Sequence, residues 1–90
     1  MPRVVITHAV QDVARWLDGG AERASALPGA RNVIDLVALD GTNSAGVAFD
    51  IDDVDGLKKM LSALPPDMAA QAESHGVITS TMAVYVDAKR

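Results

Sequence analysis

The sequence predicts a single α+β domain of βαββαβ order, in which four strands form one antiparallel sheet. The chain of 90 residues has the length of one domain. Runs rich in β-branched residues alternate with segments whose apolar residues have helical spacing. Glycine and proline mark the breaks between these segments. We therefore expect residues 1–90 to form one unit with its helices on one face of the sheet.

The first strand is predicted over residues 3–9, which are rich in β-branched side chains. Alternation places Val4, Ile6 and His8 on one face and Val5, Thr7 and Ala9 on the other. Neither face has the polar character of a surface in contact with water. We therefore expect both faces of this strand to be covered.

A helix is predicted next, beginning after Asp12 and ending at Leu27-Pro28-Gly29. Apolar residues recur along it at Val13, Trp16, Leu17, Ala21 and Ala24. The pair Gly19-Gly20 lies inside this helix. Because glycine costs about 1 kcal/mol relative to alanine in a helix, we expect a bend or break at the pair.

Two further strands are predicted to form a hairpin. They occupy residues 32–39 and 45–51, and the residues between them read DGTNS, a composition typical of turns. In a sheet formed by βαββαβ order, the first of these two strands is expected at the edge.

The remaining chain is predicted to supply the second helical unit and the last strand. Asp52 or Asp53 is suited to cap a helix whose apolar stripe is Val54, Leu57, Met60, Leu61 and Leu64. The pair Pro65-Pro66 permits a new helical start. Gly76 is expected to end that third helix, and residues 79–86 alternate as a strand.

The apolar content exceeds what the helices of one protomer can cover. Apolar residues make up 49% of the chain, and few polar residues interrupt the predicted strands. The helices cover one face of the sheet, so the other face would meet water. We therefore expect a homodimer in which the sheets of two copies pack against each other.

Composition also excludes several classes of function. The net charge is −4 and no run of Lys or Arg is present, which disfavours nucleic acid as a partner. The chain has no cysteine, so disulfides and thiolate chemistry are excluded. Neither a secretory signal nor an apolar segment of the ~20 residues that a membrane span needs is evident. We expect a cytoplasmic protein that does not bind a membrane.

The run from His8 to Trp16, HAVQDVARW, resembles the start of small stand-alone proteins of the dimeric α/β-barrel superfamily, which are related to antibiotic-biosynthesis monooxygenases. The resemblance continues at Asp52-Asp53 and at Gly76-Val77, so it spans nearly the whole chain. It implies a ferredoxin-like protomer whose sheet packs against that of a twin, with a pocket between sheet and helices. Relatives include cofactor-free oxygenases, polyketide cyclases, haem-degrading enzymes and members without a known activity.

His8 is the candidate general base. A neutral imidazole in an apolar strand could take a proton from an acidic phenol or enol. The alternative is a sheet histidine that is hydrogen-bonded to a neighbour or to the twin. Asp35 interrupts the apolar second strand and could orient His8 or bind a donor on the substrate. Its alternative role is an edge-strand charge that prevents aggregation.

Five further side chains are candidates for the pocket. Trp16 could form a flat wall of the pocket, or it could be an anchor of the core. Tyr85 could supply a hydroxyl donor to the pocket, or its hydroxyl could simply reach water. Phe49 and Met68 are candidates for contact with a substrate. His75 is also assigned to substrate binding; its alternatives are capping of a helix C-terminus and ligation of haem or a metal.

The first functional hypothesis is a cofactor-independent monooxygenase or cyclase that acts on a small aromatic or polyketide-like substrate, with His8 as base and no cofactor. The second is a non-catalytic small-molecule-binding or regulatory module of the same fold. The third is an RNA-binding sheet, which would need a basic surface and several aromatic platforms. Phe49 alone does not meet that requirement.

Overall fold

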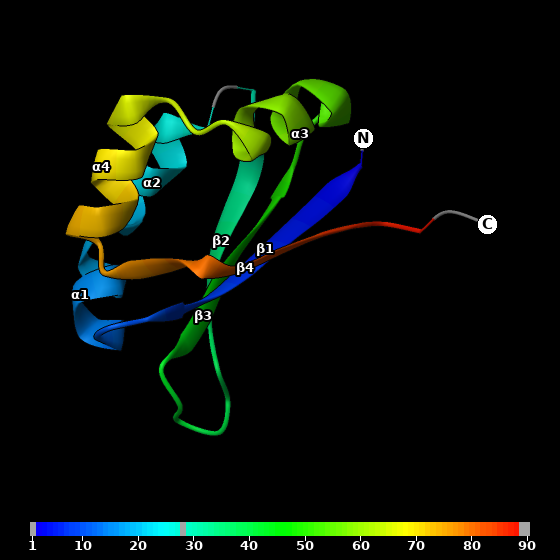
Figure 1. The fold of residues 1–90 in the computed structure, drawn as a ribbon. Coiled ribbons are helices and arrows are strands. Elements are labelled where there is room, and N and C mark those ends of the chain that lie inside the picture. Colours follow the sequence, from blue (N-terminus) through cyan, green and yellow to red (C-terminus); the bar gives the residue numbers. More distant parts are fainter. Residues whose placement is uncertain (1, 28, 89–90) are drawn as a thin grey trace.

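The computed structural model describes residues 2–27 and 29–88. Figure 1 shows one sheet with helices packed against it. The elements are β1 (Arg3–Val10), α1 (Val13–Asp18), α2 (Gly20–Ala26), β2 (Arg31–Val37), β3 (Ser44–Asp50), α3 (Val54–Ser62), α4 (Pro66–Ser74) and β4 (Val77–Val86). The predicted α+β class and βαββαβ order are confirmed, with each helical unit split into two helices.

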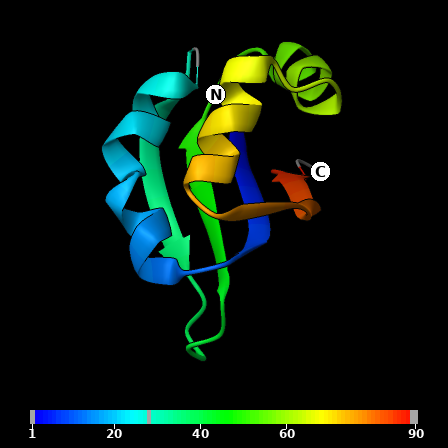
Figure 2. The same ribbon diagram turned by 60° about the vertical axis from the view of Figure 1, so that its left-hand side comes forward.

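The four strands form one antiparallel sheet in the order β2-β3-β1-β4. The predicted edge position of the first hairpin strand is therefore confirmed. Figures 1 and 2 show the helices on the same side of this sheet. The result is a two-layer ferredoxin-like arrangement with one face of the sheet open.

Alternation along the central strands decides which side chains face the helices. The register pairs Val4 with Phe49 and Ile6 with Val47, so these four side chains share a face. All four are buried. The two predicted faces of β1 are confirmed, because Val5, Thr7 and Ala9 are only half-buried on the other side.

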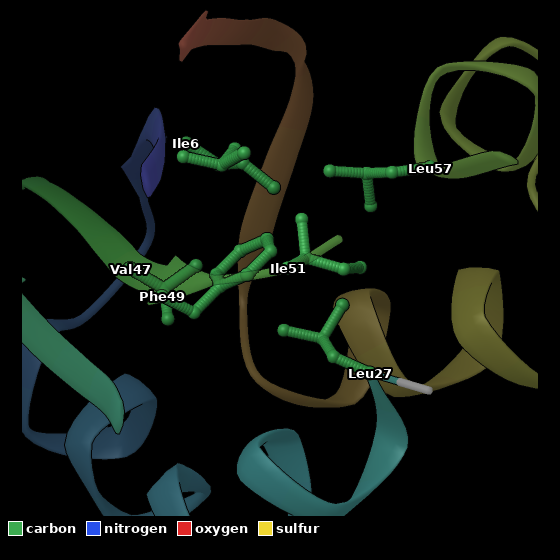
Figure 3. Close-up of a cluster of buried hydrophobic side chains, with 7 residues drawn as sticks. Ile6, Leu27, Val47, Phe49, Ile51 and Leu57 are labelled. Atoms are coloured by element: carbon green, nitrogen blue, oxygen red, sulfur yellow. The ribbon is translucent and has the colours of Figure 1, made fainter. Parts of the chain in front are cut away.

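The main core lies between this face and the helices. Figure 3 shows its side chains pointing toward one another from the sheet, from the end of α2 and from α3: Ile6, Leu27, Val47, Phe49, Ile51 and Leu57. Phe49 is fully buried at its centre. Val10, Trp16 and Ala45 form a second, smaller cluster near the start of α1. Burial of this apolar surface is the main driving force for folding.

The first helical segment breaks at Gly19, as predicted, because that residue ends α1 and caps α2. The predicted buried face was partly wrong. Leu17, Ala21 and Ala24 are exposed, whereas Trp16, Gly19, Arg23 and Leu27 are buried. These buried positions are three or four residues apart, so they form one helical stripe that includes a charged residue.

The second helical unit begins at an aspartate cap. The side chain of Asp53 accepts a hydrogen bond of 2.9 Å from the backbone N–H of Gly56. After α3, Pro65-Pro66 allows the chain to start α4, as predicted. Gly76 follows α4 with a φ of 77°, the left-handed conformation that ends helices. None of the helices in the described residues has the length and apolar content needed to cross a bilayer.

The open face of the sheet is apolar over much of its area. Ile34 and Leu36 of β2 are 47% and 38% exposed, and they pair with Ala48 and Gly46 of β3. Tyr85 of β4, which pairs with Val5, is 58% exposed on the same face. Large apolar surfaces of this kind are common where proteins associate.

The Asp53 cap leads to a test with a matched control. Replacing Asp53 by Ala removes the bond to the Gly56 N–H and is expected to lower the free energy of unfolding by about 1 kcal/mol. Asp52→Ala alters an adjacent carboxylate that does not cap the helix, and its effect should stay below about 0.5 kcal/mol. Urea unfolding of both variants measures the difference. Equal losses would show that the cap does not stabilise α3.

Candidate functional site

A cavity of about 80 Å³ lies between the covered face of the sheet and the helices. Most of its wall is aliphatic, and four polar side chains also line it: His8, Arg23, Gln71 and His75. It is partly open to solvent. In another protein an apolar cavity of about 150 Å³ holds a benzene molecule. This cavity therefore accommodates a compact group or one end of a larger molecule.

His8 lies in β1 among the side chains that face the helices. It is buried, with 7% of its surface exposed, and it lines the cavity. Its Nδ1 is 3.3 Å from the carbonyl oxygen of Ala9. A carbonyl oxygen only accepts hydrogen bonds, so Nδ1 carries the proton of the neutral ring and Nε2 carries the lone pair.

Burial lowers the pKa of His8 below its ordinary value, because the charged imidazolium loses hydration. The hydrogen bond to Ala9 opposes this effect, and the positive charge of Arg23 adds to it. The net direction is downward, so His8 is neutral at physiological pH. A neutral, buried imidazole can accept a proton from a bound molecule.

Arg23 is a buried cation in the same wall, and its side chain is only 9% exposed. Its guanidinium carbon lies 3.9 Å from the centre of the Trp16 ring, a cation–π contact. Trp16 is fully buried, and its ring meets His8 edge to face with 5.7 Å between centroids. Trp16 therefore links the cation to the candidate base.

Two side chains from other elements also meet Arg23. Nη1 donates to Nδ1 of His75 over 3.2 Å, and Nη2 is 3.2 Å from Oδ1 of Asp35. Because Nδ1 of His75 accepts this bond, the proton of the neutral ring is on Nε2, which is 3.6 Å from a carboxylate oxygen of Glu22. The cluster joins α2, β2 and the end of α4.

The pair Gly19-Gly20 makes room for this cluster. A β-carbon on Gly19 would lie 2.4–2.6 Å from three ring atoms of His75. A β-carbon on Gly20 would lie 2.5 Å from Oδ2 of Asp35. The two glycines thus do more than break the helix, because they allow both partners of Arg23 to approach.

Arg15 of α1 holds the end of α4 in place. Its Nε donates to the carbonyl oxygen of Ser74 over 2.7 Å, and its Nη2 donates to that of Glu73 over 3.0 Å. These carbonyls belong to the last turn of α4, where a positive charge is favourable. The contact fixes His75, the next residue, beside the cavity.

The structure brings three of the residues predicted for the site together at the cavity wall: His8, Met68 and His75. Asp35 and Trp16 reach the site through Arg23. The other two lie elsewhere.

Phe49 is in the main core, and Tyr85 is on the open face of the sheet. His75 is also the C-cap residue of α4, one of its expected alternative roles. Its two ring nitrogens are turned toward Arg23 and Glu22. In this arrangement Nδ1 of His75 is occupied by the hydrogen bond from Arg23. Across residues 2–27 and 29–88, no three His, Asp or Glu side chains gather into a metal-binding group.

Sequence reasoning missed Arg23. A charged residue inside a helix is usually assigned to the surface. The available signal was its spacing, because Arg23 is seven residues after Trp16 and four before Leu27, on the stripe that both occupy.

Comparison with solved structures places the fold among known proteins. SnoaB, a cofactor-independent oxygenase from Streptomyces nogalater, matches with a TM-score of 0.61 and 18% identity, over 99% of this chain and 92% of that one. The chain has the fold of this oxygenase. A Bordetella bronchiseptica protein assigned to the antibiotic biosynthesis monooxygenases matches with a TM-score of 0.62 and 10% identity, over 99% and 96%.

A second protein with that assignment, from Chloroflexus aurantiacus, gives a TM-score of 0.60 and 14% identity, over 100% of this chain and 96% of that one. These matches confirm the predicted ferredoxin-like fold. No protein-family model matches the sequence, and no curated protein matches it significantly. Shared fold alone does not assign an activity.

The contact between Gly19 and His75 can be tested by a double-mutant cycle. Gly19→Ala forces a methyl group against the buried ring and is expected to lower the free energy of unfolding by about 1–3 kcal/mol. In a His75→Ala background the same substitution should cost much less, because the ring is gone. Denaturant unfolding of the four proteins gives the coupling. Additive losses would contradict the contact.

Proposed function

We propose that the protein is a cofactor-independent enzyme of the oxygenase or cyclase type, in which His8 removes a proton from a small aromatic or polyketide-like substrate. The observation that carries this proposal is the neutral, buried His8 at the wall of an apolar cavity. The fold shared with an oxygenase that needs no cofactor supports it.

The cavity provides the chemistry that proton removal needs. A phenol or enol bound beside His8 transfers its proton to Nε2, which yields an imidazolium and a substrate anion. The charge of Arg23 stabilises that anion in surroundings of low dielectric constant. The aliphatic wall limits the access of water, so the electrostatic interaction is weakly screened.

His8 can be tested directly. His8→Gln retains a polar side chain without a basic nitrogen, and turnover of anthrone-like or phenolic substrates is expected to fall about a hundredfold or more. In the unmodified protein, turnover should be constant near neutral pH and should decline only at a pH lower than 6.5, the ordinary pKa of histidine, because the pKa of His8 is lowered and protonation removes the lone pair of Nε2.

The matched control for this test is Leu17→Ala, a change on the exposed surface of α1, which should leave turnover unchanged. A His8→Gln protein that is folded and retains full turnover would refute the proposed base. Turnover that increases as the pH falls below 6.5 would also refute His8 as the base.

The alternative is a non-catalytic small-molecule-binding module, and one observation favours it. Arg23 and His75 are bonded to each other rather than directed toward a reacting atom, as in polar networks that stabilise a pocket. A thermal shift with phenolic ligands, combined with no turnover of any of them, would select this alternative.

The proposal includes a homodimer formed through the open face of the sheet. Ile34, Leu36 and Tyr85 expose apolar surface on this face, and no helix covers it in Figure 1. The sheet of a second copy is apolar in the same way, so a symmetric contact would bury both surfaces. The cavity lies on the other side of the sheet and stays accessible.

The dimer can be tested by light scattering. We expect the mass of two 9.4-kDa chains at micromolar concentration, and the mass of one chain for Leu36→Glu, because a buried carboxylate opposes the contact. Leu17→Glu, on the surface of α1, should leave the mass unchanged. A folded, unmodified protein with the mass of one chain would contradict the proposed association.

A further inference from the structure

Two valines on the covered side of the sheet stay exposed. Val84 of β4 pairs with Ile6 of β1, and Val86 pairs with Val4. Residues paired across strands share a face, so both valines are on the side of the helices. They are nevertheless 47% and 50% exposed, and Figure 1 shows β4 beginning below α4 and running away from it. A dimer formed through the open face would not cover this surface.

Two hollows lie along this surface, where α3 borders β4. The first, of about 410 Å³, adjoins the cavity described above, because Leu61, Leu64 and Met82 line both. The second, of about 310 Å³, adjoins the first, because Leu61 and Val84 line both. The backbone of α4 packs close to β4, whereas that of α3 stays farther from it. The cavity and the two hollows therefore form a row along β4.

The walls that these spaces share are side chains with room to move. Leu61, Leu64 and Met82 are each only half-buried. Methionine is also unbranched and adapts its shape to the groups that it contacts. Rotamer changes of these side chains are thus sufficient to let a linear molecule pass from one space to the next.

The cavity beside His8 is too small for a whole ligand. Sites for small molecules usually measure about 300–1,000 Å³, and this cavity measures about 80 Å³. A molecule whose acidic group lies beside His8 must place its other atoms elsewhere, and the hollows adjoin the cavity. Within the described part of the chain, Lys58 is the one charged residue that lines them, and Ser62 and Thr79 are their other polar residues.

The length of the row indicates the length of the molecule. His8 and Val4 are in the same strand, and their spacing of four residues corresponds to about 13 Å. Val4 lines the last hollow. An extended chain of single bonds advances about 1.2 Å per bond, so about ten bonds cover this distance. A phenol with a linear hexyl tail has about this length.

We propose that the substrate of the proposed enzyme is an amphiphile, with its acidic phenol or enol beside His8 and a linear, uncharged apolar tail in the two hollows along β4. The assignment of the head group rests on the proposed function. Leu61 and Val84 are binding residues for the tail and take no part in proton removal. A cation at the end of the tail would be repelled by Lys58.

The test measures the affinity of phenols with tails of increasing length by titration calorimetry. The probes are para-methylphenol, para-butylphenol and para-hexylphenol, each below the concentration at which it aggregates. We expect each added methylene to tighten binding about two- to fourfold, because it leaves water for an apolar surface. Affinities that do not rise with tail length, or no binding of any probe, would overturn the proposal.

A variant with matched controls locates the tail. Val84→Glu places a carboxylate beside the hollows and should abolish the gain from the longer tails, while para-methylphenol binds as before. Leu17→Glu makes the same change at a residue of nearly equal exposure, 46% against 47%, and should retain the gain. Leu36→Glu, on the open face, should also retain it. If Leu36→Glu abolishes the gain and Val84→Glu does not, the tail binds the open face and the proposal is wrong.

Val84→Thr keeps the proposal testable if Val84→Glu does not fold. It preserves the size of the side chain and replaces one methyl group by a hydroxyl. The affinity for para-hexylphenol should fall about two- to fivefold and that for para-methylphenol should stay the same. Equal affinities of this variant and the unmodified protein for para-hexylphenol would contradict the assigned role of Val84.

The outcome is separable from that of the proposed enzyme. If the longer tails bind more tightly through Val84 and His8→Gln leaves turnover intact, only the catalytic proposal fails. If His8→Gln abolishes turnover and neither affinity nor KM depends on tail length, only the tail site fails.

Discussion

The burial of the Arg23 charge is the constraint on which the candidate site depends. A cation inside a small protein is tolerated only when other groups replace the water that it loses. Trp16 supplies a ring face, His75 a ring nitrogen and Asp35 a carboxylate. These groups come from α1, the end of α4 and β2, so satisfying one charge fixes the relative positions of three elements around the cavity.

The same charge also acts on the candidate base. Burial is the larger cause of the lowered pKa of His8, and Arg23 acts in the same direction. A cation that disfavours the imidazolium also favours an anion formed from a ligand. Burial thus keeps the base neutral with a contribution from Arg23, and the same cation would stabilise the anion that the base creates. Trp16 lies between the two and contacts both.

The sheet separates two surfaces with different tasks. Its covered face supplies the core and the cavity, including His8. Its open face presents Ile34, Leu36 and Tyr85 without a helix above them. Because successive side chains of a strand alternate between the faces, one strand serves both surfaces. This separation explains why Tyr85 is remote from the cavity although it is in the strand next to His8.

The sequence by itself determined the order of the elements, the helix break at Gly19 and the two faces of β1. These features follow from local rules: strand alternation, helical spacing, capping and the conformational preferences of glycine and proline. Only the tertiary structure revealed the Arg23 cluster and the second role of Gly19-Gly20. Asp35 and His75 are far from Arg23 in the sequence, and their approach depends on packing between layers, which no local pattern encodes.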